Sequence, residues 1–81
     1  MNNINAIFDI LTHEYNSIKK DNADKGASSN PAIDIYKACE FTKEQFKDVK
    51  DLGIVKYTGT HAIICVIDYN GNHSGDITLD L

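Results

Sequence analysis

The stretch 41-FTKEQFKDVKDLGIV-55 decides how this chain is expected to fold. It begins with Thr42 and, three residues later, Gln45, a spacing that forms a capping box at the start of a helix. Apolar residues then recur at steps of three, as the buried stripe of a helix requires: Phe46, Val49, Leu52. Gly53 suits the left-handed residue that ends a helix. The sequence therefore predicts a helix over residues 42–52.

Two more helices are predicted upstream. An amphipathic helix over residues 3–20 is indicated by one apolar stripe: Ile4, Ile7, Phe8, Leu11, Tyr15, Ile18. Residues 21–30 have no large apolar side chain and many turn formers, so we expect a flexible loop. Pro31, capped by Asn30 or Ser29, starts a second helix that ends near Glu40. Its inward residues should be Ile35, Tyr36 and Cys39, with Ile33 near the edge.

After residue 53 the periodicity changes to that of strands. A short strand is expected from residue 54, a continuous β-branched strand over 61–69, a hairpin loop at 70–75 and an alternating strand over 76–81. Pairing Tyr69 with Asp76, or Ile67 with Ile77, leaves the strand at 61–69 apolar on both sides. Such a strand needs cover from the loop, the first helix or a second subunit, and we expect a homodimer.

Length and composition favour one small folded domain that spans residues 1–81. The net charge is −4 and every one of the eight basic residues is a lysine, which opposes nucleic-acid binding without excluding it. The two cysteines are expected to be free thiols in a cytoplasmic protein. We expect no signal peptide at the N-terminus, and the apolar run at 62–67 is too short to cross a membrane.

The order of helix, helix, tight turn, helix, short strand and hairpin resembles the winged helix-turn-helix family. The resemblance covers nearly the whole chain and is carried by residues 35–55, where five apolar positions match those that hold the family's helix pair together: Ile35, Cys39, Phe41, Phe46, Val49. The chain departs from the family at Tyr36, where a small residue is usual, and at Glu40, where glycine is usual. The fold implied is α+β, with three helices followed by a β-hairpin wing.

The resemblance implies that the third helix enters the major groove of double-stranded DNA. The residues that would then contact DNA come from that helix, the wing and the end of the first helix: Lys43, Gln45, Lys47, Lys50, Lys56, Asn70, Asn72, His73, Lys19, Lys20. The acids Glu44, Asp48 and Asp51 interrupt the same helix face and oppose such contacts. The implied role is a DNA-binding regulator of transcription, or an accessory protein of a plasmid or phage.

The alternative is an acidic winged helix that docks a basic protein partner, as a DNA mimic or inhibitor. The layout of charge separates the two: lysines gathered on one face favour DNA, and gathered acids favour the partner. We expect no enzyme activity and no cofactor. The histidines and cysteines show no metal-ligand spacing: His13, His61, His73, Cys39, Cys65. The segment from Asp68 lacks the glycine and glutamate of a calcium loop.

Overall fold

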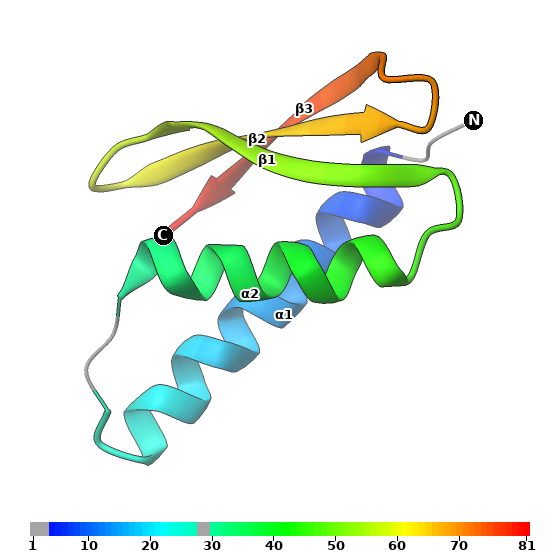
Figure 1. The fold of residues 1–81 in the computed structure, drawn as a ribbon. Helices are drawn as coiled ribbons and strands as arrows, with labels where there is room; N and C mark the ends of the chain where they lie inside the picture. Colours follow the sequence, from blue (N-terminus) through cyan, green and yellow to red (C-terminus); the bar gives the residue numbers. More distant parts are fainter. Residues whose placement is uncertain (1–3, 28–29) are drawn as a thin grey trace.

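The computed structural model describes residues 4–27 and 30–81. Within that part of the chain, two helices precede three strands: α1 (Ile4–Asp24), α2 (Pro31–Glu44), β1 (Val49–Tyr57), β2 (His61–Asp68) and β3 (His73–Asp80). The strands form an antiparallel sheet in the order β1-β2-β3. Both helices lie on the same side of this sheet, and β1 runs back along α2 (Figure 1). The fold is a two-layer α+β arrangement, and no helix formed by the described residues covers the second face of the sheet.

The predicted three helices with a β-hairpin wing are wrong, because residues 42–52 do not form a helix. Instead, α2 continues through the predicted turn at Glu40 and ends at Glu44, and β1 begins at Val49. Thr42 does not cap a new helix; its buried hydroxyl donates to the Ala38 carbonyl one turn earlier, at 2.7 Å. The chain therefore has no separate helix at residues 42–52 that could enter the major groove of DNA.

Two irregularities in β1 explain why a strand shows helical spacing. The pairing with β2 shifts between Val49 and Asp51, so that Lys50 is an extra residue in the ladder. A bulge of this kind lets residues three apart share one strand face, and Val49 and Leu52 are both buried there. A second shift, between Ile54 and Lys56, repeats the effect farther along β1. The buried residues of this bulged strand therefore show the same i, i+3 spacing as those of a helix.

The core lies between the helices and the near face of the sheet. Buried side chains come from both helices and all strands: Ile7, Leu11, Tyr15, Ile35, Ala38, Cys39, Val49, Leu52, Ala62, Ile64, Val66, Ile77, Leu79. The sequence placed Ile7, Leu11 and Tyr15 correctly on the inward stripe of α1. Phe8 and Tyr36, both predicted to face inward, are exposed.

The connection between the helices differs in part from the predicted loop at 21–30. Helix α1 extends to Asp24, and Gly26 adopts a φ of 69° just beyond it, as expected of a helix C-terminus. Asn30 caps α2 by accepting from the backbone N–H of Ile33, which confirms one of the two predicted caps. Asn22 donates to the buried Asp34 carboxylate at 3.2 and 3.3 Å, which ties the end of α1 to the start of α2. Residues 28–29, inside the predicted loop, lie outside the described residues.

Both predicted hairpin registers are wrong. Cys65 is the cross-strand partner of Asp76, and Ile64 is the partner of Ile77. Val66 pairs with Gly75 but Ile67 pairs with His73, so Ser74 is an extra residue in β3. The bulge shortens the loop and turns His73 to the sheet face opposite the helices.

Among residues 4–27 and 30–81, no helix combines the length and the apolar character that crossing a bilayer requires.

Candidate functional site

The predicted DNA contacts are dispersed over several elements instead of lining one helix. Lys43 lies in the last turn of α2, Gln45 follows that helix, and Lys47 is in the turn before β1. Lys50 and Lys56 belong to β1. The remaining residues lie in α1, in the β2–β3 loop and at the start of β3: Lys19, Lys20, Asn70, Asn72, His73. Val49 pairs with Asp68, so Lys47 and Lys50 lie at the same end of the sheet as the β2–β3 loop, whereas Lys56 lies near the other end of β1. DNA binding by these residues stays a prediction.

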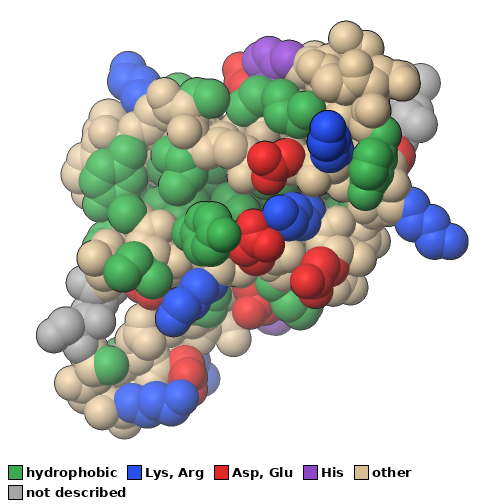
Figure 2. All heavy atoms as spheres, viewed as in Figure 1, with side chains coloured by type: hydrophobic (Ala, Val, Ile, Leu, Met, Phe, Trp, Pro, Cys, Tyr) green, Lys and Arg blue, Asp and Glu red, His purple; other side chains and the backbone are tan. Residues whose placement is uncertain are grey.

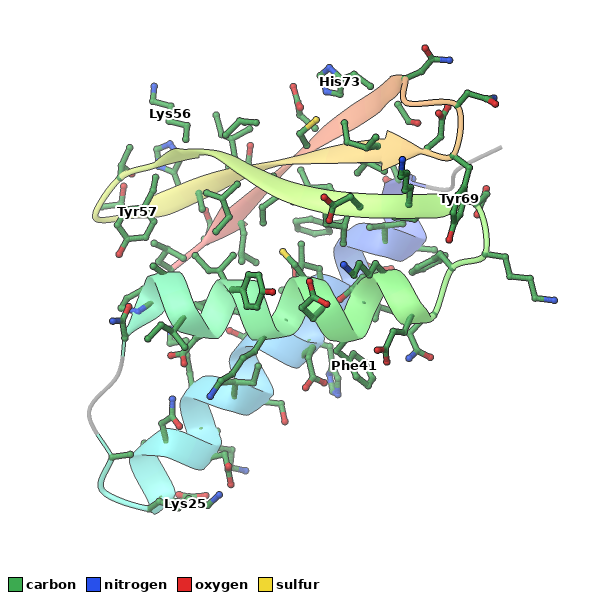
Figure 3. The ribbon with its side chains drawn as sticks, viewed as in Figure 1. Lys25, Phe41, Lys56, Tyr57, Tyr69 and His73 are labelled. Carbon is green, nitrogen blue, oxygen red and sulfur yellow. The ribbon has the colours of Figure 1, made fainter. Side chains whose placement is uncertain are left out.

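Lys43 and Lys25 form ion pairs with neighbouring acids. Lys43 contacts Glu40 at 2.9 Å and Asp51 at 3.7 Å, and the hydrogen bond that Lys43 donates to Glu40 raises the pKa of its ammonium group. Lys25 contacts Asp21 at 2.9 Å. Figure 3 shows Lys25 at the far end of α1 and Lys56 on the opposite side of the sheet. On the face shown in Figure 2, lysines and acids are interspersed, so this face favours neither predicted partner.

Apolar side chains gather where the second half of β1 lies over the first half of α2 (Figure 2). We call this the α2–β1 apolar surface and define it by Ile33, Tyr36, Ile54 and Tyr57. These side chains are 51%, 62%, 39% and 48% exposed, respectively. Figure 3 shows Tyr57 directed from β1 toward the helix layer. Exposed aromatic and aliphatic side chains that cluster in this way are typical of protein-binding surfaces.

The border of the α2–β1 apolar surface carries both signs of charge. Lys43, Glu40 and Asp51 form a linked group between α2 and the start of β1. Lys37 is exposed on α2 and Lys56 on β1. A border of mixed charge does not select a strongly basic or strongly acidic partner.

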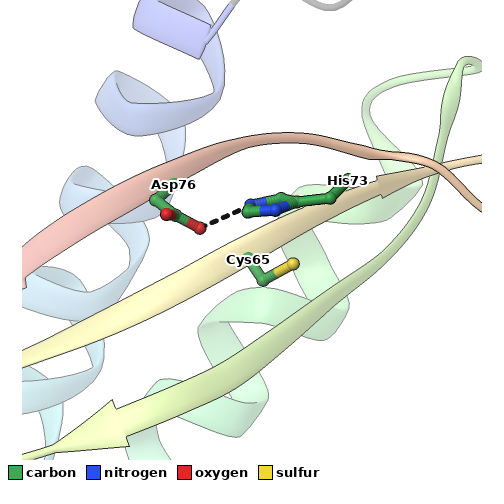
Figure 4. Close-up of side chains that lie close together, drawn as sticks. All are labelled: Cys65, His73 and Asp76. Carbon is green, nitrogen blue, oxygen red and sulfur yellow. Dashed lines mark hydrogen bonds and ion pairs between the residues drawn. The ribbon is translucent and has the colours of Figure 1, made fainter.

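A second constellation occupies the sheet face opposite the helices. Cys65 on β2 and His73 and Asp76 on β3 point to the same side of the sheet (Figure 4). One potential ligand atom from each lies within 4.8 Å of the other two. His73 Nε2 donates to Asp76 Oδ1 at 2.6 Å and lies 3.1 Å from the Gly75 carbonyl oxygen. A thiol, an imidazole and a carboxylate are the donor types that bind zinc in proteins.

The two thiols have different surroundings. Cys39 is buried in the core, and this burial, helped by Asp51 and Glu40, raises the pKa of its thiol to about 12. Cys65 is half-buried, and its pKa is also raised, by desolvation first and then by the carboxylates of Asp76 and Asp51. Both cysteines are free, as the sequence predicted. Without a metal, neither is an activated nucleophile.

The sequence prediction missed the group of Cys65, His73 and Asp76 because its members are not spaced like metal ligands along the chain. They meet only through strand pairing, and both predicted hairpin registers placed Cys65 away from Asp76. The signal that could have revealed the group is a bulge at Ser74, which a sequence pattern alone does not specify.

Comparisons with protein-family models, with curated proteins and with solved structures found no match to this chain.

Proposed function

We propose that this protein functions through protein–protein association and that the α2–β1 apolar surface docks a second copy of the same chain. The observation that carries the proposal is the gathering of apolar side chains where β1 lies over α2 (Figure 2), two segments whose residues Ile33, Tyr36, Ile54 and Tyr57 are exposed. A chain of 81 residues buries only about 60% of its unfolded surface, so an added interface contributes substantially to stability. The free thiols Cys39 and Cys65 support a cytoplasmic location as part of this proposal.

A second copy fits the surface better than a partner of opposite charge. In a two-fold dimer each subunit presents the same patch, so the patch must complement itself. The linked border charges of Lys43, Glu40 and Asp51 allow this, because each copy offers both a cation and an anion. The two bulges in β1 disfavour continuous strand addition at the sheet edge. We therefore expect side chains, not a shared sheet, to hold the dimer.

The test is the mass in solution, measured by light scattering during size-exclusion chromatography. We expect the wild type to elute with twice the 9.0 kDa mass of one chain. Tyr36→Glu should yield a monomer, because the two-fold axis brings two new charges together in an apolar contact. Tyr36→Ser should weaken the dimer by about 2 kcal/mol, or roughly 30-fold in the dissociation constant, as expected for a central aromatic.

Tyr69→Ser is the matched control. Tyr69 is 66% exposed, a fraction similar to the 62% of Tyr36, but it lies in the β2–β3 loop. This variant should remain a dimer with an unchanged dissociation constant, and circular dichroism should show that all variants are folded. A monomeric wild type at high concentration, or a Tyr36→Glu variant that stays dimeric, would contradict the proposal.

The same preparations decide the prediction of DNA binding. Because residues 42–52 do not form a third helix, and because Lys43 and Lys25 form ion pairs with acids, we expect no band shift of duplex DNA at about 150 mM salt. A shift whose log–log salt dependence has a slope of several, and which Lys56→Ala or Asn72→Ala weakens without unfolding the protein, would instead support DNA binding.

A further inference from the structure

We propose that Cys65, His73 and Asp76 bind one Zn²⁺ ion on the sheet face opposite the helices, which we call the open face. A fourth coordination position is left to water or another ligand. This site is separate from the α2–β1 apolar surface. It rests on the convergence of three ligand atoms within 4.8 Å of one another. The surface pair of His73 and Asp76 alone would not indicate a metal, but the Cys65 thiol of the neighbouring strand completes a set of three donors.

The donor chemistry selects zinc over the alkaline-earth ions. Calcium and magnesium take oxygen ligands, whereas Cys65 and His73 offer sulfur and nitrogen. Zinc accepts thiolate, imidazole and carboxylate together, usually in tetrahedral geometry. When the ion binds, Cys65 releases its thiol proton to solvent, and His73 changes tautomer: Nε2 gives up the proton that it donates to Asp76 while Nδ1 takes one up, so that the ring stays neutral.

The required rearrangement is small and confined to side chains. Two nitrogen or oxygen ligands of a tetrahedral zinc ion are about 3.3 Å apart, given metal–ligand distances near 2.0 Å. His73 Nε2 and Asp76 Oδ1 are 2.6 Å apart and must separate slightly, while the thiol sulfur moves toward them. The side chains of His73 and Asp76 are 54% and 52% exposed, so both have room to rotate.

The backbone places these side chains on one face. Cys65 and Asp76 are direct cross-strand partners, which fixes the separation of their Cβ atoms at about 5 Å. Regular alternation along β3 would put His73 on the same side as Gly75, toward the helices. The extra residue at Ser74 reverses this, and His73 pairs with Ile67 on the open face. The sheet therefore fixes the strands that carry all three donors before any ion arrives.

The experiment titrates the reduced full-length protein with Co²⁺ and with Zn²⁺, each as the metal alone. We expect one ion per chain, a thiolate-to-cobalt charge-transfer band, the intense visible bands of tetrahedral Co²⁺, and their loss when Zn²⁺ displaces cobalt. Zn²⁺ should also raise the melting temperature of the wild type, because the ion binds the folded chain. Cys65→Ser should abolish the charge-transfer band.

His73→Ala and Asp76→Asn should each weaken Zn²⁺ binding by at least about tenfold, since even outer partners of metal ligands are worth that much. The matched controls are His13→Ala, an exposed histidine of α1, and Asp80→Asn, an exposed carboxylate of β3. Both should bind as the wild type does. The proposal is overturned if no charge-transfer band forms, or if His73→Ala binds Zn²⁺ as tightly as His13→Ala does.

Discussion

Cys39 and Cys65 show how one residue type acquires two roles from its surroundings. Cys39 faces the core from α2, whereas Cys65 is half-buried on the open sheet face. Sequence patterns identified both as free thiols, because one sits in an apolar helix pattern and the other in an apolar strand pattern. They did not show that Cys65 points away from the core, since a strand that is apolar on both sides has no obvious inward face.

Alkylation separates the two thiols. In the absence of metal, we expect iodoacetamide at about pH 8 to modify Cys65 at least tenfold faster than Cys39, because burial limits access to Cys39 and raises the pKa of its thiol to about 12. Mass spectrometry of peptides after timed quenching measures both rates. Equal rates in the folded protein, with a much faster reaction of both in urea as the reference, would contradict the burial of Cys39.

The raised pKa of Cys39 also predicts a loss of stability in alkali. The unfolded thiol ionises at its ordinary value of 9.0, while the folded thiol holds its proton to about 12. Stability from this thiol is therefore complete below pH 9.0 and is lost as pH rises toward 12, by up to about 1.4 kcal/mol per pH unit. Urea unfolding of the wild type and Cys39→Ala at several pH values measures the difference, which should shrink above pH 9.0. A constant difference would disprove it.

At the scale of elements, sequence patterns located α1, the start of α2, the second half of β1 and the two strands of the hairpin, but not the first half of β1 or the end of α2. Where they succeeded, one signal dominated: the continuous stripe of α1, the Asn30–Pro31 start, the β-branched run of β2. They failed at residues 42–52 because two bulges let β1 bury residues at helical spacing. No local propensity marks these bulges; they depend on pairing with β2.

The link between Asn22 and Asp34 gives a prediction for the helix pair. Asn22→Ala should lower the free energy of unfolding by about 1.5 kcal/mol, because it removes a hydrogen-bond donor from a buried carboxylate. Asn16→Ala, an exposed substitution in the same helix, is the control and should change stability by less than about 0.5 kcal/mol. Urea denaturation of both variants measures the effect, and equal midpoints would show that the link contributes little.

At the scale of the whole molecule, the helix layer leaves two surfaces of different character. The α2–β1 apolar surface lies along the margin between helix and sheet, while Cys65, His73 and Asp76 occupy the far face of the sheet. Sequence analysis predicted a need for apolar cover and a homodimer, and the homodimer stays a prediction; it assigned exposed polar side chains to DNA. The sequence alone could not reveal either surface, because the residues of each surface are brought together only by the fold.

A dimer held by apolar side chains should resist salt. We expect the mass of the wild type to stay at the dimer value between about 0.1 and 0.5 M NaCl, because screening weakens charge pairs but not apolar contacts. Light scattering at both salt concentrations measures this. Tyr36→Ser, whose dimer is weakened but not abolished, serves as the sensitive reference. Dissociation of the wild type in high salt would point to an interface dominated by ion pairs such as those of Lys43.

The extra residue at Ser74 has a consequence for variation in this hairpin. It shifts the phase of β3 by one position, so the chemistry of the far face depends on the pairing of the strand as well as on side-chain identity. Deleting Ser74 would remove the extra residue and leave His73 directly before Gly75, so regular alternation would keep the imidazole on the same face as Cys65 and Asp76. The cluster should therefore survive the loss of this one codon, because the bulged and the regular strand present the same three donors on the same face.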